Sequence, residues 1–514
     1  MMTKILRWFS VGLLLLGGDA ARAEAGDLKG FGPALHEFKL TLKAGRRVEA
    51  AGPLFYREES GDVSTWAISP LLSYARDVGV DSTEMDLLYP VITFDRYGEE
   101  YRIQLLQWLS WSGGRALKDA NVHRFTVFPF YFRQRSDLPE RNYVALFPLF
   151  GRVENRFFRS EVEWVVWPIY VKTRRGVRAN FAESDDFRSP ARRNIEMRGV
   201  GRSGVTTYNY LLPFFHVREA DGLQGWQFWP LVGHERKIVT AHTNSWGEVE
   251  TIPGHTKSFL FWPVAFKQET GIGSDNESRF RAVLPFYSSL RSPQRDSTAY
   301  LYPLGVTVTD DRVRGYHEVG APWPLVVFAN GEGKTTRRIW PFYSRASNTN
   351  LETGWFLWPL YTYNRLHADP LERERTRVLF FLYSDTREKN TATGGERRRR
   401  EMWPLFQHRR DPEGRERLQI LSPLEPFAPT SRSIERNYSQ VWSLWRSEAD
   451  PRIGARSASL LWNLYRRDET PETKKLSLLF GLFQYESGPD SRRWRLFYLP
   501  AGSSRHNPPA ASGP

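Results

Sequence analysis

The stretch Phe261-Trp262-Pro263-Val264-Ala265-Phe266 carries a signature that recurs along most of the chain. An aromatic or aliphatic residue precedes a proline, an apolar residue follows it, and an aromatic residue often completes the set. Clear further copies are Trp167-Pro168-Ile169-Tyr170, Trp340-Pro341-Phe342-Tyr343 and Trp403-Pro404-Leu405-Phe406. A repeat of this kind indicates that each copy belongs to one structural unit of a repetitive fold.

The copies follow one another at steps that are mostly about 17 to 23 residues long. Together they predict about 22 units between residues 50 and 500. Copies with the proline lie at positions 53, 70, 90, 129, 148, 168, 213, 230, 263, 285, 303, 324, 341, 359, 404 and 423. Copies that keep the aromatic frame without the proline lie near Trp108, Phe380, Trp442, Trp462, Phe480 and Phe497.

The unit over residues 159–172 shows the pattern of a β-strand. Val162, Trp164, Val166 and Tyr170 share one parity, and polar residues such as Glu163 begin the other. Alternation with β-branched and aromatic residues is typical of strands. Turn-forming residues separate the units, so we expect an antiparallel meander with one motif in each strand.

The prolines favour an irregular backbone at each motif, because proline cannot donate to a strand ladder. Two interpretations remain open. Every strand has a bulge or kink at the same height, or the proline begins a new segment at a corner. Later copies carry Ser443, Asn463 or Gly481 at this position, which favours a local backbone irregularity over a need for the ring.

The number of strands predicts closure, because open sheets rarely exceed about 10 strands. We therefore predict an all-β fold in which a large antiparallel meander of about 22 strands closes into a β-barrel over residues 26–500. Residues 1–25 have the features of a signal peptide, with Lys4, Arg7, a short apolar run and small residues around Ala23. Residues 501–514 are rich in Ala, Ser and Pro and predict a disordered tail.

Composition and motifs give no support for an enzyme. The 514 residues include no cysteine, which excludes disulfides and thiolate chemistry. We expect no cofactor and no metal. The glycines of residues 199–204 lack a strand-to-helix context, and Gly333-Lys334-Thr335 lacks the glycine that a phosphate loop needs. His234 and His242 do not have zincin spacing, and residues 273–277 lack the full spacing of a calcium loop.

The formal charge of +14 is carried largely by arginine. A solvated rim is the plain interpretation of these residues. A cationic lumen that favours anionic solutes, or a rim that binds lipid phosphate through bidentate guanidinium contacts, is the functional one. Nucleic acid is not expected, because the charge is dispersed and the chain is expected to be exported. Candidate anion or lipid-phosphate contacts are Arg174, Arg175, Arg337, Arg338, Arg397, Arg398, Arg399 and Arg400.

A signal peptide followed by aromatic-rich strand-turn units resembles the porin-like outer-membrane β-barrels of Gram-negative bacteria. The resemblance is architectural, identifies no specific family and transfers no functional residue. It implies a passive channel or envelope structural component of the outer membrane, in contact with its lipid. The longer segments 172–205 and 234–256 are expected to leave the sheet on one side. The alternative is a soluble periplasmic β-repeat protein that acts as a binding module, which apolar residues on both parities near the motif favour.

Overall fold

The computed structural model describes residues 32, 34–115, 121–175, 204–243, 249–429, 431–489 and 491–505. The first part of the chain contains β1 (His36–Lys39), β2 (Arg46–Ala50), η1 (Gly52–Leu54), β3 (Phe55–Ser60), β4 (Val63–Ile68), β5 (Leu72–Asp77), β6 (Ser82–Leu87), β7 (Ile92–Tyr97), β8 (Glu100–Leu105), β9 (Leu109–Gly113), β10 (Val122–Val127), β11 (Tyr131–Ser136), η2 (Pro139–Arg141), β12 (Tyr143–Leu146), β13 (Phe150–Arg156), β14 (Arg159–Val165) and β15 (Tyr170–Arg175). The middle part contains β16 (Val205–Tyr210), β17 (Phe215–Ala220), β18 (Leu223–Phe228), β19 (Val232–Lys237), β20 (Thr240–Thr243), β21 (Val249–Ile252), β22 (Gly254–Leu260), β23 (Ala265–Ile272), β24 (Ser278–Val283), β25 (Tyr287–Arg291), β26 (Arg295–Tyr300), β27 (Val306–Asp311), β28 (Tyr316–Gly320), β29 (Val326–Gly331) and β30 (Lys334–Ile339). The last part contains β31 (Tyr343–Asn348), β32 (Leu351–Phe356), β33 (Tyr361–Ala368), β34 (Leu371–Val378), β35 (Tyr383–Asn390), β36 (Glu396–Met402), β37 (Phe406–Arg410), β38 (Glu416–Ile420), α3 (Arg432–Ile434), η4 (Glu435–Ser439), α4 (Gln440–Trp442), β39 (Trp445–Asp450), β40 (Ala455–Leu460), β41 (Tyr465–Glu469), β42 (Lys474–Leu478), β43 (Phe483–Ser487), β44 (Ser491–Leu496) and β45 (Leu499–Arg505).

One antiparallel meander contains all the described strands except the hairpin of β20 and β21. Each strand pairs with its neighbours in sequence, and β19 pairs with β22 across that hairpin. The predicted all-β meander is therefore confirmed. The predicted number of strands is wrong, because the sheet has 43 strands, close to two for every motif.

The motif lies in a turn and not in the middle of a strand. In Val166-Trp167-Pro168-Ile169, the peptide bond before the proline is cis, and the Ile169 amide donates to the Val166 carbonyl at 2.7 Å. This is a type VI turn, in which a cis proline occupies the third position. All the motif prolines except Pro53 and Pro423 follow a cis bond. Of the two interpretations of the proline, the one that places it at a corner between two segments is therefore confirmed. The interpretation as a bulge or kink within each strand, which the later copies favoured, is wrong.

Neighbouring motif turns are hydrogen-bonded to one another. The Trp167 amide donates to the Pro148 carbonyl at 2.7 Å, and the Trp262 amide donates to the Pro230 carbonyl at 2.6 Å. The rings also meet, with Trp229 and Trp262 centroids 5.7 Å apart. The motif turns thus form a connected strip along one edge of the sheet, which we call the motif edge.

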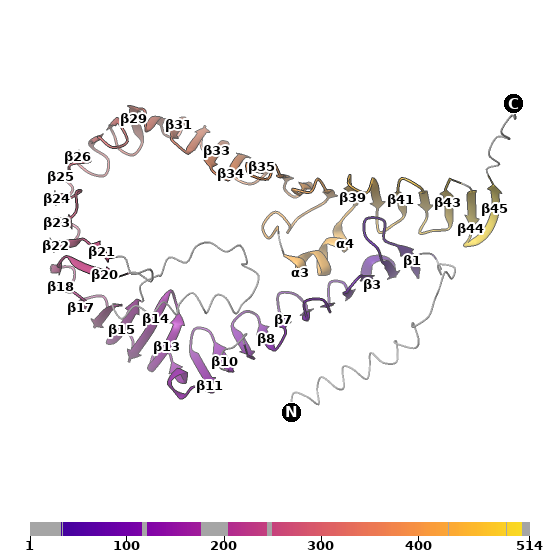
Figure 1. The fold of residues 1–514 in the computed structure, drawn as a ribbon, viewed down its shortest axis with the longest axis horizontal. Coiled ribbons are helices and arrows are strands. Elements are labelled where there is room, and N and C mark those ends of the chain that lie inside the picture. Colours follow the sequence, from indigo (N-terminus) through magenta and orange to yellow (C-terminus); the bar gives the residue numbers. More distant parts are fainter. Residues whose placement is uncertain are drawn as a thin grey trace.

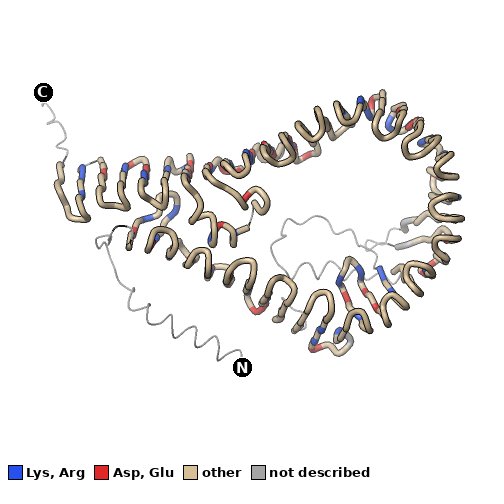
Figure 2. The backbone as a smooth tube through the Cα atoms, turned by 180° about the vertical axis from the view of Figure 1, so that it is seen from behind, with Lys and Arg blue, Asp and Glu red and all other residues tan. Residues whose placement is uncertain are grey.

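The sheet bends round into a ring, and its first strands return to its last ones (Figure 1). The same outline is seen from behind in Figure 2. In the described residues, β1 pairs only with β2 and β45 only with β44. The two ends of the sheet meet instead through side chains and through a helical insertion, residues 421–429 and 431–444, which contains α3, η4 and α4.

The helical insertion identifies the concave face of the sheet. Tyr56 on β3 and Gln419 on β38 both contact it, so their parity faces the inside of the ring. The concave residues nearest the motif edge are often small and buried, as in Ala67, Ser73 and Ala145. Small side chains on one face let a sheet bend toward that face, because bulky neighbours would clash there.

The two long segments leave from the edge opposite the motif turns. β15 and β19 both begin at the motif edge and end at the opposite one, so both connections emerge on the same side, as expected. The segment 234–256 contains the β20–β21 hairpin. Residues 176–203 and the predicted signal peptide lie outside the described residues. β45 continues to Arg505, so residues 501–505 of the predicted disordered tail belong to a strand, and residues 506–514 lie outside the described residues.

Candidate functional site

A row of apolar side chains crosses the sheet beside the motif edge. It consists of the strand residue next to each motif turn, and cross-strand pairing places its members side by side on the convex face. Val165, Tyr170, Tyr210, Phe215 and Phe228 show the pattern, each paired in register with the next. The row has one break, at β28. Its members are Phe55, Ile68, Leu72, Leu87, Ile92, Leu105, Leu109, Val127, Tyr131, Leu146, Phe150, Val165, Tyr170, Tyr210, Phe215, Phe228, Val232, Leu260, Ala265, Val283, Tyr287, Tyr300, Val306, Val326, Ile339, Tyr343, Phe356, Tyr361, Val378, Tyr383, Met402, Phe406, Ile420, Trp445, Leu460, Tyr465, Leu478, Phe483, Leu496 and Leu499.

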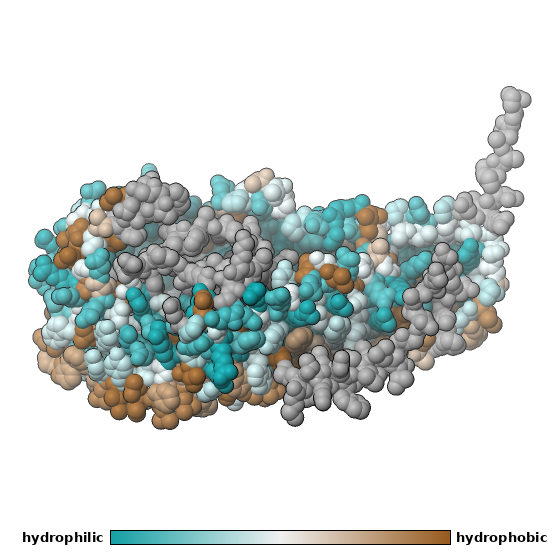
Figure 3. Space-filling model, turned by 60° about the horizontal axis from the view of Figure 1, so that its bottom comes forward, coloured by the Kyte–Doolittle hydropathy of each residue, from teal (hydrophilic) through white to brown (hydrophobic). Residues whose placement is uncertain are grey.

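This row and the motif turns together form a surface that we call the apolar rim. Its turn residues are well exposed, with Phe286 at 66%, Leu304 at 62% and Phe342 at 58%. Figure 3 shows hydrophobic side chains gathered along one edge of the ring, while hydrophilic ones dominate away from it. An exposed apolar surface this extensive marks a protein or membrane contact.

The opposite edge, which we call the polar edge, has mostly hydrophilic turns, although single apolar residues such as Phe158 and Val313 are exposed there. Gly98 supplies a left-handed turn conformation (φ 57°), and the side chains of Asn348 and Asp411 accept hydrogen bonds from turn amides. Charged residues also occupy the convex face between the two edges, such as Arg279 and Arg281 on β24. The ring is therefore amphipathic along its strands, apolar at one edge and polar at the other.

The predicted arginines of residues 397–400 divide between the two faces of β36. Arg398 and Arg400 lie on the convex face, and their guanidinium nitrogens are 2.8 and 3.6 Å from Asp385. Arg399 lies on the concave face, 3.2 Å from Glu401. Arg397 is concave as well and forms no ion pair in the described part of the chain.

The other four predicted arginines lie on two other strands. Arg174 and Arg175 are exposed at the end of β15. Arg337 is exposed on β30, and the half-buried Arg338 donates to Ser344 at 3.5 Å. β15, the β30 region and β35–β36 occupy separate parts of the ring, so the eight residues do not form one site.

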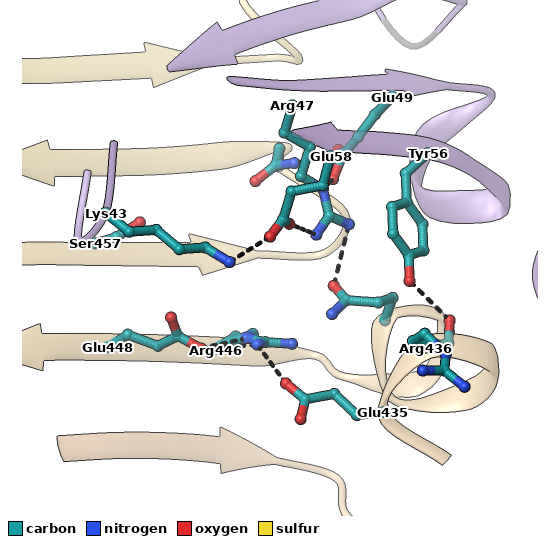
Figure 4. Close-up of polar contacts among 12 residues, drawn as sticks. Lys43, Arg47, Glu49, Tyr56, Glu58, Glu435, Arg436, Arg446, Glu448 and Ser457 are labelled. Atoms are coloured by element: carbon teal, nitrogen blue, oxygen red, sulfur yellow. Dashed lines mark hydrogen bonds and ion pairs between the residues drawn. The ribbon is translucent and has the colours of Figure 1, made fainter. Parts of the chain in front are cut away.

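Buried polar contacts join the insertion to the first strands (Figure 4). The Tyr56 hydroxyl donates to the Arg436 carbonyl at 3.2 Å. The Arg436 guanidinium forms ion pairs with Glu84 and Asp86, the latter at 3.0 Å, and Asn437 also donates to Asp86 at 3.0 Å. Asp86 and Asn437 are fully buried, so each depends on these partners.

A second cluster joins the insertion to the last strands. Arg446 on β39 is 2.7 Å from Glu448 and 3.1 Å from Glu435, and Arg417 on β38 is 2.5 Å from Glu435. Burial alone would raise the pKa of Glu435, but Arg417 and Arg446 outweigh it and lower that pKa to about 2. Burial also acts to raise the pKa of Glu448, but the same two arginines outweigh it and lower that pKa.

We expect the contact between the insertion and the last strands to weaken in acid. The folded-state pKa of Glu435 is below the ordinary value of 4.5, so its contribution to stability is present above pH 4.5 and is lost as the pH falls toward 2. Glu435 keeps 41% of its side-chain surface exposed, which limits the size of the effect. Hydrogen exchange of α3 and α4 as a function of pH measures it. Glu435→Gln should remove the part of this dependence that Glu435 causes, and an unchanged profile in that variant would contradict the assignment.

A cavity of about 840 Å³ lies where the two ends of the sheet and the insertion meet. Its lining is densely charged, and Arg397 and Arg409 belong to it. They lie in a larger group of concave arginines that we call the arginine shelf. The shelf consists of Arg373, Arg375 and Arg377 on β34, Arg397 and Arg399 on β36, and Arg409 on β37.

The candidate contacts chosen from the sequence did not include Arg373, Arg375, Arg377 or Arg409. Arg373-Glu374-Arg375-Thr376-Arg377 places three arginines on alternate positions, which in a strand puts them on one face. That alternation was the available signal. Arg409 could not be linked to them without the register, which pairs Arg399 with Arg409.

The weak chemical motifs have structural roles where they are described. Lys334 forms an ion pair with Glu318 on β28, and His234 is hydrogen-bonded to Ser258 at 2.9 Å. No group of three or more His, Asp or Glu side chains in the described ranges has the arrangement of a metal site. Residues 199–203 lie outside those ranges.

None of the described helices is long and apolar enough to cross a membrane. Comparison with known proteins finds no matching family model and no matching curated protein.

Proposed function

We propose that the protein is an envelope component of the Gram-negative outer membrane that holds its apolar rim in one leaflet of the bilayer. The observation that carries this proposal is the apolar row, which continues beside the motif turns of nearly the whole meander. The expected export of the chain and its net positive charge fit an anionic lipid surface.

The hydrogen bonds of the motif turns support contact with lipid. Unpaired backbone groups are costly in hydrocarbon, where no water can satisfy them. At the apolar rim many of these groups are paired between neighbouring turns, as in the Trp358 amide and the Pro341 carbonyl at 2.8 Å. This pairing lowers the cost of bringing the rim into an apolar phase.

The narrowness of the apolar band favours one leaflet over a complete crossing. The motif turn and one or two strand residues give an apolar depth of roughly 5–10 Å, similar to that of interfacial anchors. Transmembrane barrels carry a band about 25 Å tall and strands of about 9–11 residues. The longest described strands have 8 residues, and charges such as Arg281 begin close to the apolar row. A through-bilayer channel with β1 paired to β45 therefore has less support than an envelope component.

Flotation of the purified full chain on a density gradient with lipid vesicles tests the proposal. We expect it to rise with vesicles of mixed phosphatidylethanolamine and phosphatidylglycerol, and its tryptophan fluorescence to be quenched by brominated acyl chains. Quenching should be stronger for bromines placed near the headgroup than for those at the bilayer centre. Equal quenching at all depths would favour a crossing, and a protein that stays soluble and free of lipid would refute the proposal.

A further inference from the structure

The arginine shelf has little to neutralise it. Only Arg399 forms an ion pair in the described part of the chain, with Glu401. Glu388 lies in register between Arg373 and Arg397, yet it forms no ion pair with either. Six guanidinium groups thus face the inside of the ring, and the carboxylates that act on Arg375 and Arg409 are Glu388, Glu401 and Glu435.

The shelf arginines also have unused donors. The Nε atoms of Arg373, Arg375 and Arg409 are buried and have no hydrogen-bond partner. Burial and the neighbouring Arg377, Arg373 and Arg399 lower the pKa of Arg375. Burial, followed by the charge of Arg417, lowers the pKa of Arg409 to about 10. Like charges at such sites raise the free energy of the empty protein, and a bound anion would relieve that repulsion.

The spacing of the shelf defines the kind of anion. Arg399 and Arg409 are register partners on adjacent strands, which lie about 4.8 Å apart. Arg375 pairs with Thr386, which pairs with Arg399, so the backbones of Arg375 and Arg399 lie about 9.6 Å apart. Guanidinium groups bind phosphate oxygens by two parallel hydrogen bonds, and arginines attached to the sheet at these intervals suit several linked or clustered phosphates better than one.

We propose that the arginine shelf is a binding site for oligophosphate groups, formed by Arg375, Arg399 and Arg409 with Arg373, Arg377 and Arg397 around them. The phosphates come from a free oligophosphate or from a lipid headgroup that carries phosphate. This inference does not depend on the insertion of the apolar rim into lipid, because the shelf lies on the concave face.

Calorimetric titration of the full chain with inorganic tripolyphosphate tests the site. We expect saturable binding that weakens by about tenfold or more in Arg375→Gln/Arg409→Gln, since each lost charged hydrogen bond has an effect of that order. The matched control, Arg279→Gln/Arg281→Gln, removes the same charge from the convex face, where neither residue forms an ion pair in the described ranges. It should change the affinity by less than about twofold. Equal losses in both variants, or no binding by the unaltered chain, would overturn the proposal.

Two further measurements test whether the shelf variant is folded and where the bound phosphates come from. Without ligand, the shelf variant should melt no lower than the unaltered chain, because it loses repulsion and not an ion pair; a large drop would assign the shelf a structural role instead. Vesicles with and without cardiolipin, whose headgroup links two phosphates, then compare the two sources. A gain in binding that needs both cardiolipin and the shelf identifies a lipid headgroup. No gain, or a gain that is equal in the shelf variant, excludes the headgroup and leaves a free oligophosphate as the source.

Discussion

Arg436→Met should open the ring at the contact between the helical insertion and β6. The substitution introduces an apolar side chain of similar length and removes the charge that pairs with Glu84 and Asp86. Because Asp86 is only 2% exposed, it would remain as a buried carboxylate without its cation. Removing one partner of a buried pair costs about 3–5 kcal/mol, so protection of nearby amides should fall roughly 10²–10⁴-fold.

Hydrogen exchange by mass spectrometry locates this effect along the chain. We expect loss of protection in α3, α4 and β3 to β6, with β22 to β30 unchanged, since those strands lie on the far side of the ring. Arg432→Met is the control, because Arg432 is only 3.7 Å from the same Glu84 but its side chain is 71% exposed. Its effect should stay below about 1 kcal/mol. Uniform loss of protection around the ring would show that Arg436 supports the sheet and not its closure.

A double variant separates the buried charge from the contact itself. Asp86→Asn added to Arg436→Met removes the uncompensated carboxylate, so part of the lost protection should return. If the double variant is less stable than the unaltered chain by the sum of the two single effects, the two residues act independently. That result would contradict the pairing on which the closure argument rests.

The alternation of residues 159–172 predicted β-structure correctly but concealed a turn. Val162 and Trp164 share a face, and counting onward by twos assigns Tyr170 to it as well. In the structure Val165 pairs with Tyr170 and Trp164 pairs with Val171, so the parity changes at Pro168. The positive φ of Val166 (47°) and the cis bond before Pro168 let the chain reverse there. A parity count contains no information about either dihedral.

The same reversal explains why both parities near the motif are apolar. Leu211-Leu212-Pro213-Phe214-Phe215 suggested a strand buried on both sides, yet it spans a motif turn. Leu211, Phe214 and Phe215 belong to the apolar rim, with Leu211 55% exposed. The feature that favoured a soluble repeat is therefore the feature that forms the exposed rim.

The ring closure could not be predicted from sequence patterns. Arg436 and Asp86 are 350 residues apart, and neither lies in a motif. Local periodicity specifies a strand and its neighbours, because adjacent strands pair through the chain that joins them. Contacts between the two ends depend on the curvature accumulated over the whole sheet, which small concave residues such as Ala67 and Ala145 allow but do not fix individually.

Phe286→Glu, Leu304→Glu and Phe342→Glu together should abolish vesicle binding while leaving the sheet intact. The three residues follow the prolines of separate motif turns and are exposed, so they support no core. Withdrawing each from lipid costs about 1.5–3 kcal/mol, and three together exceed the equivalent of a 10³-fold loss of partitioning. The added carboxylates weaken binding further, because they would enter the leaflet as charges.

The polar edge provides a matched control of the same chemistry. Phe158 and Val313 lie in turns of that edge and are 95% and 69% exposed. Phe158→Glu/Val313→Glu should float with vesicles as the unaltered chain does, because in the proposed arrangement that edge faces away from the bilayer. If the two sets of substitutions reduce flotation equally, surface hydrophobicity in general and not the apolar rim drives binding. The unaltered chain could instead prove to be a dimer in solution that only the rim substitutions separate. The rim would then be an interface between two copies, because pairing of two such rims buries the same side chains that a leaflet would.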